Sequence, residues 1–114
     1  MAPPVWFPWT AKVDASVKVA LRTEFTAIDP SAGAAAIYEI EVEYEGKGVY
    51  INPEDFKRYL DSFRTERVRR EQLCERIWRD VKSALGENTP VRVRLATKCS
   101  GVTVIVERGE GAQP

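Results

Sequence analysis

The chain has 114 residues, a formal net charge of zero and 30% charged residues. This length predicts one domain with a single core. Balanced charge argues against a protein that grips nucleic acid by bulk charge, because neutralising phosphates requires a basic surplus or a concentrated basic patch. No apolar run approaches the length that crosses a bilayer, and the N-terminus lacks the pattern of a signal peptide. We therefore expect a cytoplasmic protein with no membrane partner.

The residue types that usually carry metal and nucleophilic chemistry are scarce. The sequence has no histidine, which removes the commonest general base and metal ligand. It also has no glycine-rich phosphate loop and no metal-ligand spacing. We expect neither a metal nor a cofactor. Cys74 and Cys99 are expected to be free, partly buried thiols, because disulfides are rare in the cytoplasm.

Composition divides the chain into an arm, a domain and a tail. Residues 1–11 form an arm rich in proline and tryptophan, which we expect to pack on its own domain or on a neighbouring subunit. Contact with a ligand is the alternative for the arm. Residues 12–108 form the domain, and residues 109–114 form a frayed tail.

The first part of the domain is predicted to form two strands. Residues 12–25 alternate between apolar and polar side chains, which indicates a long strand with one wet face. Residues 26–36 contain Asp-Pro and Ser-Ala-Gly, which indicate a loop. Residues 38–45 alternate again, and we expect a turn at 46–48.

The polar face of the second predicted strand is a ladder of glutamates: Glu39, Glu41, Glu43 and Glu45. Lys12, Lys18 and Arg22 on the first strand are the expected cross-strand partners. We interpret this ladder as a solvated or inter-subunit face. Four carboxylates without another ligand type do not indicate a metal site.

Residues 52–86 have the one long helical pattern in the sequence. Asn52 is the expected N-cap, Pro53 suits the first turn, and Gly86 is placed to end the helix. The apolar pattern thins after residue 62, which predicts a break near Thr65.

Two further strands follow, at 91–99 and 102–107, joined by a tight turn at Ser100-Gly101. The order of strand, strand, helix pair, strand, strand predicts an α+β fold. In it, helices cover one face of a four-stranded antiparallel sheet. Such a sheet leaves exposed edges, and another copy of the chain is the expected partner, giving a homo-oligomer.

Two segments of the sequence resemble a known enzyme family. FKRYLDSFRTERVRREQL, residues 56–73, resembles the helix of the 7-cyano-7-deazaguanine nitrile reductases, where a tyrosine-leucine, serine-phenylalanine-arginine run precedes a phenylalanine-histidine-glutamate triplet. EFTAIDPSAG, residues 24–33, lies at the same distance from the helix as that family's phenylalanine-threonine, cysteine-proline segment. The resemblance implies the tunnelling fold, in which ββααββ units assemble into barrels and bind purines or pterins at subunit interfaces.

The positions that carry function in that family are mostly changed. The resemblance places Asp29 at the nucleophilic cysteine, Ala36 at the acid/base aspartate, and Asn52 at the glutamate that opens the NADPH motif. Arg70 stands at the histidine, and Glu71 matches the glutamate that anchors the ring edge. The resemblance therefore implies a catalytic position at Asp29 and ligand-binding positions at Glu71, Asn52 and Arg70.

A second branch of the family lacks the NADPH motif. It is the archaeal amidinotransferase that converts the cyano-deazaguanine base in tRNA to archaeosine. The sequence resembles that branch in its short length and in the acidic motif at residues 54–57, although that branch also uses the cysteine. These departures argue against NADPH-dependent nitrile reduction, because thioimide formation needs a thiolate.

Each candidate residue has two interpretations. Asp29 could be an acid or base if burial raises its pKa, or a turn former bonded to nearby N–H groups. Glu71 could anchor a ring edge, or could be a solvated helix residue paired with Arg67 or Arg70. The arginine run at residues 67–79 could pair with acidic neighbours or contact an RNA backbone.

The leading functional hypothesis is a diverged member of this family, with or without turnover. It would bind a purine-like or 7-deazapurine base at a subunit interface through Glu71, with Asp29 in place of the nucleophile. One alternative is a non-catalytic binding or regulatory subunit, with tRNA as a candidate partner. Another is an amidinotransferase-type tRNA-modifying enzyme that uses a different group.

Overall fold

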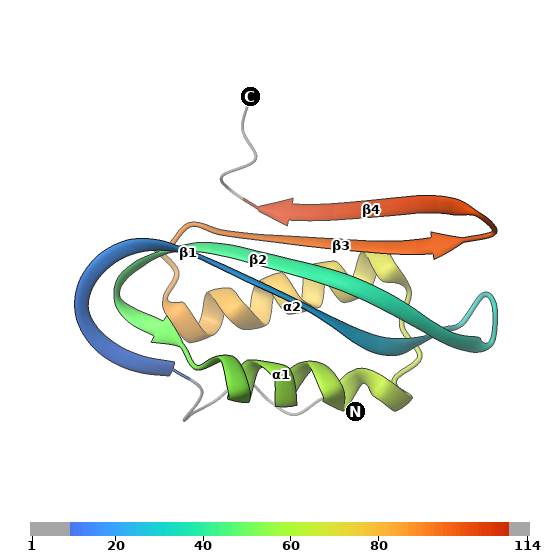
Figure 1. Ribbon diagram of the computed structural model, residues 1–114, viewed down its shortest axis with the longest axis horizontal. Helices are drawn as coiled ribbons and strands as arrows, with labels where there is room; N and C mark the ends of the chain where they lie inside the picture. The colour runs from blue at the N-terminus through green and yellow to red at the C-terminus, as the bar shows by residue number, and fades with distance from the viewer. Residues whose placement is uncertain (1–9, 110–114) are drawn as a thin grey trace.

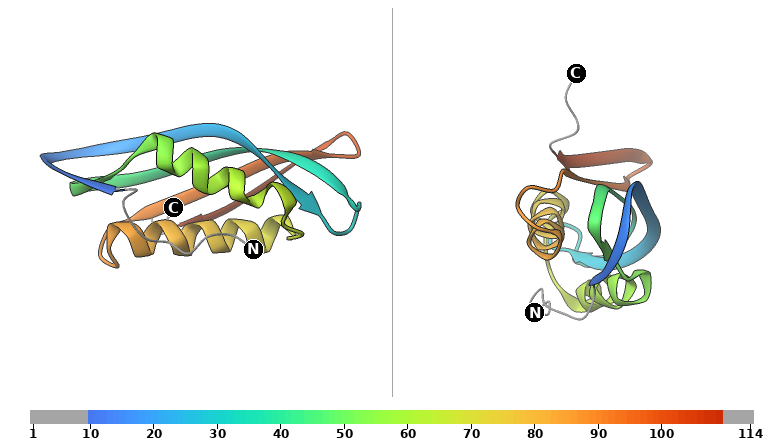
Figure 2. Two further views of the ribbon diagram at one scale, coloured as in Figure 1. Left: turned by 90° about the horizontal axis from the view of Figure 1, so that it is seen from below. Right: turned by 90° about the vertical axis from the view of Figure 1, so that its left-hand side faces the viewer.

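The computed structural model describes residues 10–109. Its strands are β1 (Thr10–Asp29), β2 (Ala34–Ile51), β3 (Val91–Cys99) and β4 (Val102–Gly109), and its helical elements are α1 (Pro53–Asp61), η1 (Ser62–Thr65) and α2 (Arg70–Leu85). The strands form one antiparallel sheet in the order β1-β2-β3-β4. Both helices cover the same face of this sheet (Figures 1 and 2). The predicted α+β architecture is confirmed.

The helix boundaries follow the capping residues. The Asn52 side chain accepts a hydrogen bond from the Glu54 N–H at 3.0 Å, and Pro53 is the first residue of α1. The break expected near Thr65 is confirmed, because α1 gives way to the η1 turn and α2 begins only at Arg70. The helix ends at Leu85, and Gly86 has a φ of 113°, which a residue without Cβ adopts most easily.

The core lies between the helices and the sheet. Phe63 is fully buried at its centre, with ring centroids 5.3 Å from Tyr59 and 6.2 Å from Phe25. Burying an aromatic or aliphatic side chain of this kind stabilises the fold by about 1.5–3 kcal/mol. The Tyr59 hydroxyl donates a hydrogen bond to Asp80, so this phenol is satisfied inside the helix layer.

The first hairpin is longer than predicted. The expected loop at 26–36 shrinks to a turn at 30–33, because residues 26–29 pair with residues 34–37. The expected turn at 46–48 is also wrong, since these residues lie inside β2 and the register shifts opposite them, between Lys12 and Ser16. Gly48 takes a φ of 95° there, and the Tyr50 ring covers Gly46 so closely that a Cβ would clash with it.

The first half of β1 extends beyond the helices. Val13 and Val17 were predicted on the buried face, yet they are 50% and 53% exposed. Farther along the strand, Val19 and Leu21 pack against the core and Phe25 is buried. The apolar side chains of β1 therefore alternate as predicted. In a single chain, however, no element within residues 10–109 covers the first half of this strand.

The glutamate ladder pairs with basic side chains from both neighbouring strands. Arg22 of β1 binds Glu41 at 3.0 Å, as expected, and Arg92 of β3 binds Glu43 at 2.9 Å. Lys12 lies opposite Val49 and not opposite a glutamate, because of the register shift. The partners from β3 were not predicted, since the β2–β3 register cannot be read from alternation alone.

Residues 1–9 and 110–114, which hold most of the predicted arm and tail, lie outside the described residues. Within residues 10–109, Thr10 and Ala11 already pair with Ile51 and Tyr50. No helix in this part of the chain is long and apolar enough to cross a membrane.

Candidate functional site

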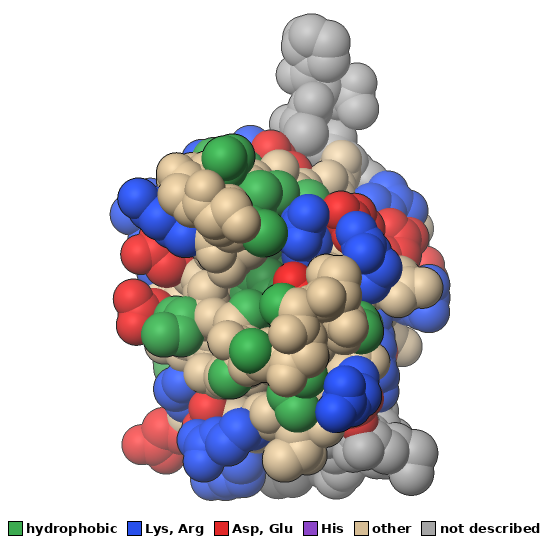
Figure 3. Space-filling model, turned by 90° about the vertical axis from the view of Figure 1, so that its right-hand side faces the viewer, with side chains coloured by type: hydrophobic (Ala, Val, Ile, Leu, Met, Phe, Trp, Pro, Cys, Tyr) green, Lys and Arg blue, Asp and Glu red, His purple; other side chains and the backbone are tan. Residues whose placement is uncertain are grey.

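A cleft opens where the two hairpins part. The β2–β3 ladder has its last pair at Glu39 and Ala96, and beyond it the β1–β2 and β3–β4 hairpins are not bonded strand to strand. The Thr97 hydroxyl donates to the Ile37 carbonyl oxygen at 2.9 Å. The cleft has a volume of about 650 Å³. Figure 3 views the molecule from this end, with acidic and basic side chains around its hollow.

The walls of the cleft come from both hairpins and from the start of α2. One wall is the beginning of β2, where the small side chains of Ala34, Ala35 and Ala36 leave room. The opposite wall is the β3–β4 turn, including Lys98 and Cys99. Asp29, Tyr38 and Arg70 also line it. Ala36, which the resemblance places at the family's acid/base aspartate, lines the cleft with a methyl group that cannot transfer a proton.

Asp29 ends β1 and is almost fully buried, with 9% of its surface exposed. One carboxylate oxygen, Oδ1, accepts hydrogen bonds from the Ser31 N–H at 3.0 Å and the Ser31 hydroxyl at 2.7 Å. These two bonds, helped by the charges of Arg70 and Arg69, hold the pKa of Asp29 below its usual value, although burial acts in the opposite direction. The condition for acid/base chemistry, a raised pKa, is therefore not met within one chain.

The segment between η1 and α2 fixes the position of Arg70 and Glu71 next to Asp29. The Ile28 N–H donates to the Glu66 carbonyl oxygen at 2.9 Å, and the Val68 N–H donates back to the Ile28 carbonyl oxygen at 3.1 Å. Arg67 and Ile28 thus form an isolated parallel bridge at the end of β1. Because this bridge comes just before α2, the first turn of the helix lies beside the Asp29 turn.

Arg70 stands between two carboxylates. Its Nη1 is 4.0 Å from Asp29 Oδ2, and its Nε is 3.5 Å from Glu71 Oε2. Both separations are long for hydrogen bonds, and the buried Nε makes none within residues 10–109. The structure thus brings together three of the four predicted site residues, Asp29, Arg70 and Glu71.

Glu71 is about half exposed and lies in the first turn of α2. A hydrogen bond from its own backbone N–H lowers its pKa, and the nearby charges of Arg69 and Arg70 lower it further. Its Oε1 is 3.4 Å from Arg69 Nε. Glu71 does not line the Asp29 cleft but a neighbouring hollow on the helix side, with Val68 and Gln72, so Arg70 separates the two carboxylates.

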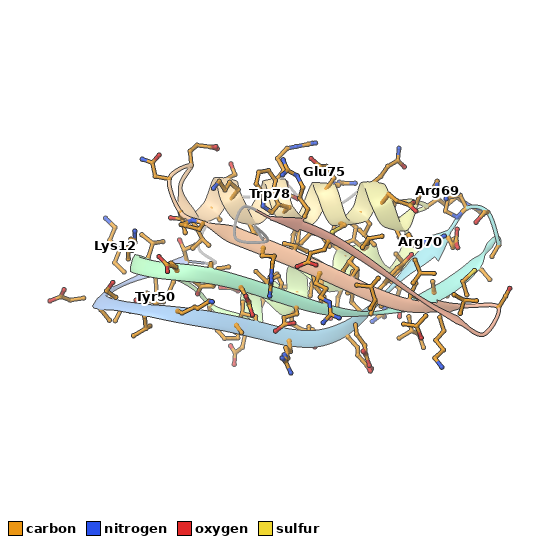
Figure 4. All side chains as sticks on the ribbon, turned by 90° about the horizontal axis from the view of Figure 1, so that it is seen from above. Lys12, Tyr50, Arg69, Arg70, Glu75 and Trp78 are labelled. Carbon is orange, nitrogen blue, oxygen red and sulfur yellow. The ribbon has the colours of Figure 1, made fainter. Side chains whose placement is uncertain are left out.

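Asn52 is not part of this constellation within one chain. It follows β2 at Ile51, whereas Asp29 pairs with Ala34 at the other end of the same strand. Figure 4 shows the distance along the sheet, with Tyr50 at one end and Arg70 at the other. The side-chain oxygen of Asn52 already accepts the hydrogen bond that caps α1.

Sequence reasoning missed two residues of the cleft. Tyr38 is buried beside Asp29, and both burial and the Asp29 charge raise the pKa of its phenol, which stays protonated and able to donate. Cys99 is free and exposed, contrary to the partly buried thiol expected, and it lines the same cleft as Asp29. The strand alternation placed both residues on strands, but only the sheet register brings Cys99 to the Asp29 turn.

Three of the five arginines in the run at residues 67–79 have acidic partners. Arg69 and Arg70 contact Glu71, and Arg76 lies 3.5 Å from Glu66 and over the Phe63 ring. These contacts follow the interpretation of a helix face with acidic partners.

The hydrogen bond from the Ser31 hydroxyl is the largest single cause of the lowered Asp29 pKa, and Ser31→Ala removes it while the backbone N–H bond remains. We therefore expect Ser31→Ala to raise that pKa more than Arg70→Gln does, as measured by carbon-13 NMR titration of the carboxyl group. Arg64→Gln is the matched control, because Arg64 makes no contact with Asp29, and it should leave the pKa unchanged. A larger shift for Arg70→Gln than for Ser31→Ala would contradict this order.

The same titration bears on stability. Since the folded pKa is lowered, the contribution of Asp29 to the free energy of unfolding is present above the ordinary aspartate value of about 3.9. It is lost only as the pH falls through the folded value. Asp29 is thus a fixed negative charge throughout the neutral range.

Comparison with known proteins agrees with this architecture. No family model matches the sequence. The archaeosine synthase of Pyrobaculum calidifontis is 31% identical over 97 residues, which are 84% of this chain and 87% of that protein. The crystal structure of the archaeosine synthase QueF-Like in the apo form matches with a TM-score of 0.80 and 29% sequence identity, over 88% of this chain and 99% of that chain. The chain therefore belongs to the archaeosine synthase family and has its tunnelling fold.

Proposed function

We propose that the protein binds a purine-like or 7-deazapurine base at the end of the molecule where the hairpins part. Glu71 holds the ring edge, and Asp29 occupies the place of the nucleophile. The observation that carries this proposal is the pair of carboxylates on either side of Arg70, with Asp29 lining the cleft and Glu71 lining the neighbouring hollow, in a chain of this family. The cleft volume of about 650 Å³ lies within the usual range for small-molecule sites.

The chemistry of Glu71 suits a guanine-like edge. An ionised carboxylate offers two acceptor oxygens, and a guanine edge offers two adjacent N–H donors, so the pair can form two parallel charge-assisted bonds. Its present partners Arg69 and Arg70 lie at 3.4 Å and 3.5 Å, so a ligand has little to displace. Its half-exposed side chain is accessible from outside the chain.

Asp29 supports binding more than turnover. A carboxylate adds poorly to a nitrile, whereas the thiolate of the related enzymes is polarisable. Its lowered pKa also makes it a weak base at neutral pH. These residues favour a non-catalytic protein. It would bind the free base, or tRNA that carries the base.

The test is a calorimetric titration with guanine, 7-cyano-7-deazaguanine, a pterin and tRNA carrying the cyano base. We expect Glu71→Gln to weaken binding about tenfold or more, because a hydrogen bond to a charged group contributes about 1.5–3 kcal/mol. Glu54→Gln is the matched control, since Glu54 also lies in a first helical turn. Equal affinities for wild type and Glu71→Gln would exclude Glu71 as the anchor, and no binding by any titrant would exclude the proposed function.

We further propose that the site is completed by a second copy of the chain in a homo-oligomer. Val13 and Val17 are half exposed on a strand half that no element within residues 10–109 covers. Asn52, at the opposite end of the sheet from Asp29, would approach the cleft from such a copy. Covering exposed strand faces and edges is the usual reason for closed assembly.

Light scattering tests the assembly. We expect the wild-type protein to be a closed oligomer and the double variant Val13→Lys, Val17→Lys to be monomeric, because two buried charges at an interface are costly. The control, Asp14→Lys between them, reverses a charge on the same strand and should keep the oligomer. A monomeric wild type would contradict the proposal.

Cys99 makes an amidinotransferase the second candidate function. Its exposed thiol lines the same cleft as Asp29. The sulfur could add to the nitrile carbon to form a thioimide, and ammonia could then displace the thiol and leave an amidine. No reductant is needed, and each atom of the nitrile is retained.

Mass spectrometry distinguishes this candidate. Incubation with 7-cyano-7-deazaguanine should give an adduct equal to the sum of the two masses, since addition has no leaving group. We expect Cys99→Ser to abolish the adduct and Cys74→Ser to keep it, because Cys74 is buried and burial raises its pKa to about 11. Absence of the adduct in the wild-type protein would dismiss covalent catalysis through Cys99.

A further inference from the structure

The phenol of Tyr38 is an uncommitted hydrogen-bond donor on the wall of the cleft. Its ring is buried, with 1% of the residue exposed, and it stacks on Phe25 at a centroid distance of 5.6 Å. The residue nevertheless lines the cleft. Its hydroxyl makes no hydrogen bond within residues 10–109, and its oxygen is not fully enclosed by this part of the chain. The ring is therefore fixed in the core, while the hydroxyl borders the open space of the cleft.

The other hydroxyl groups on the cleft walls are less suited to select a ligand. The Thr97 hydroxyl already donates to the Ile37 carbonyl oxygen at 2.9 Å. Ser100 and Thr103 are exposed, so water can satisfy their hydroxyls with or without a ligand. Tyr38 differs because its ring is held in the core and cannot turn its hydroxyl away. A ligand that covers this hydroxyl without accepting from it leaves a donor unsatisfied, which is costly.

The phenol remains a donor throughout the neutral range. Burial, followed by the negative charge of Asp29, raises the pKa of Tyr38 above the ordinary tyrosine value, although the charge of Arg70 acts in the opposite direction. Asp29 is ionised over the same range, because its pKa is lowered, and an ionised carboxylate can only accept hydrogen bonds. These neighbours therefore present one donor and one acceptor to a ligand in the cleft.

The charge of the cleft favours a neutral partner for the Tyr38 hydroxyl. Two acidic residues, Glu24 and Glu39, and two basic residues, Arg70 and Lys98, line the walls and cancel. The ionised Asp29 then leaves one negative charge in excess. This charge repels an anionic group on a ligand, whereas it repels a neutral carbonyl or nitrile much less. The acceptor that suits this donor is therefore an uncharged one.

We propose that Tyr38 is a specificity-determining residue of this cleft, whose hydroxyl donates a hydrogen bond to an uncharged acceptor atom on the bound ligand. The inference rests on the proposed base-binding function and adds to it a residue that the resemblance did not indicate. The acceptor belongs to the 7-substituent of the base, because the resemblance places Asp29 at the nucleophile that attacks this substituent in the related enzymes. Tyr38 thus rejects a base whose substituent has the same shape but no acceptor.

The test compares two linear substituents of nearly equal size by calorimetry, in 7-cyano-7-deazaguanine and 7-ethynyl-7-deazaguanine. The cyano nitrogen has a lone pair that accepts a hydrogen bond, whereas the end of the ethynyl group has none. We expect the wild-type protein to bind the cyano base about threefold to tenfold more tightly, because a neutral hydrogen bond contributes this much. In Tyr38→Phe, which keeps the ring that packs on Phe25, the ratio should fall below about twofold.

Tyr50→Phe is the matched control. It removes a phenol at the opposite end of the sheet, where the Tyr50 hydroxyl donates to the Ala15 carbonyl oxygen at 2.7 Å (Figure 4). This variant should keep the wild-type ratio. In the wild-type protein, the carbon-13 NMR signal of Tyr38 Cζ should move with the cyano base and stay in place with the ethynyl base, which reports the hydrogen bond without any variant.

The outcomes separate the role of Tyr38 from base binding itself. Equal affinities of the wild-type protein for the two bases, an unmoved Tyr38 signal, or a cyano preference that persists in Tyr38→Phe would each overturn the role of Tyr38 while base binding stands. If the wild-type protein binds neither base, the base-binding function fails and this inference fails with it. Because the wild-type affinities and the NMR signal need no variant, an unfolded Tyr38→Phe protein would not hide the answer.

Discussion

The cleft exists because the β2–β3 ladder stops before either strand ends. Strand pairing stops at Glu39 and Ala96, although both strands continue beyond this pair. The two hairpins then separate, and Asp29 and Cys99, at the tips of different hairpins, face a common space. Three alanines at the start of β2 keep that space open. A full ladder would fill it with strand and leave no cleft.

The second constraint is the short parallel bridge between Ile28 and the segment before α2. Two backbone hydrogen bonds hold the helix N-terminus to the end of β1, so the spacing of Arg70 and Asp29 does not depend on long side chains alone. Backbone attachment of this kind gives a site more precision than a mobile loop could. It also explains why Arg70 and Asp29, which are far apart in sequence, are neighbours in the fold.

Local chemistry made some features predictable from the sequence. Asn52, Pro53 and Gly86 marked the helix ends correctly, because capping depends on neighbours within one turn. Alternation found all four strands, but it could not give their partners. The glycines at 46 and 48 look like a turn, yet β2 continues through both. Gly46 pairs with Val17 of β1, and Gly48, with a φ of 95°, lies opposite the register shift between Lys12 and Ser16.

Some features of the site were also predictable from the sequence, and others were not. The resemblance brought Asp29, Arg70 and Glu71 together, and the structure places them side by side. The ionisation of Asp29 could not be foreseen, because it depends on how the Ser31 hydroxyl turns toward the carboxylate. Cys99 lies far from Asp29 along the chain, and only the register of the second hairpin places it in the same cleft. Non-local pairing is the information that the sequence pattern lacks.

The bulge near Gly48 has a geometric consequence. A bulge increases local twist and bends a ribbon, and here it lies where β1 and β2 leave the helix layer. The hairpin curves round at this position, so that the end of β2 at Ile51 meets the start of α1 at Pro53 (Figure 1). The bend therefore decides where the chain passes from the sheet into the helix layer.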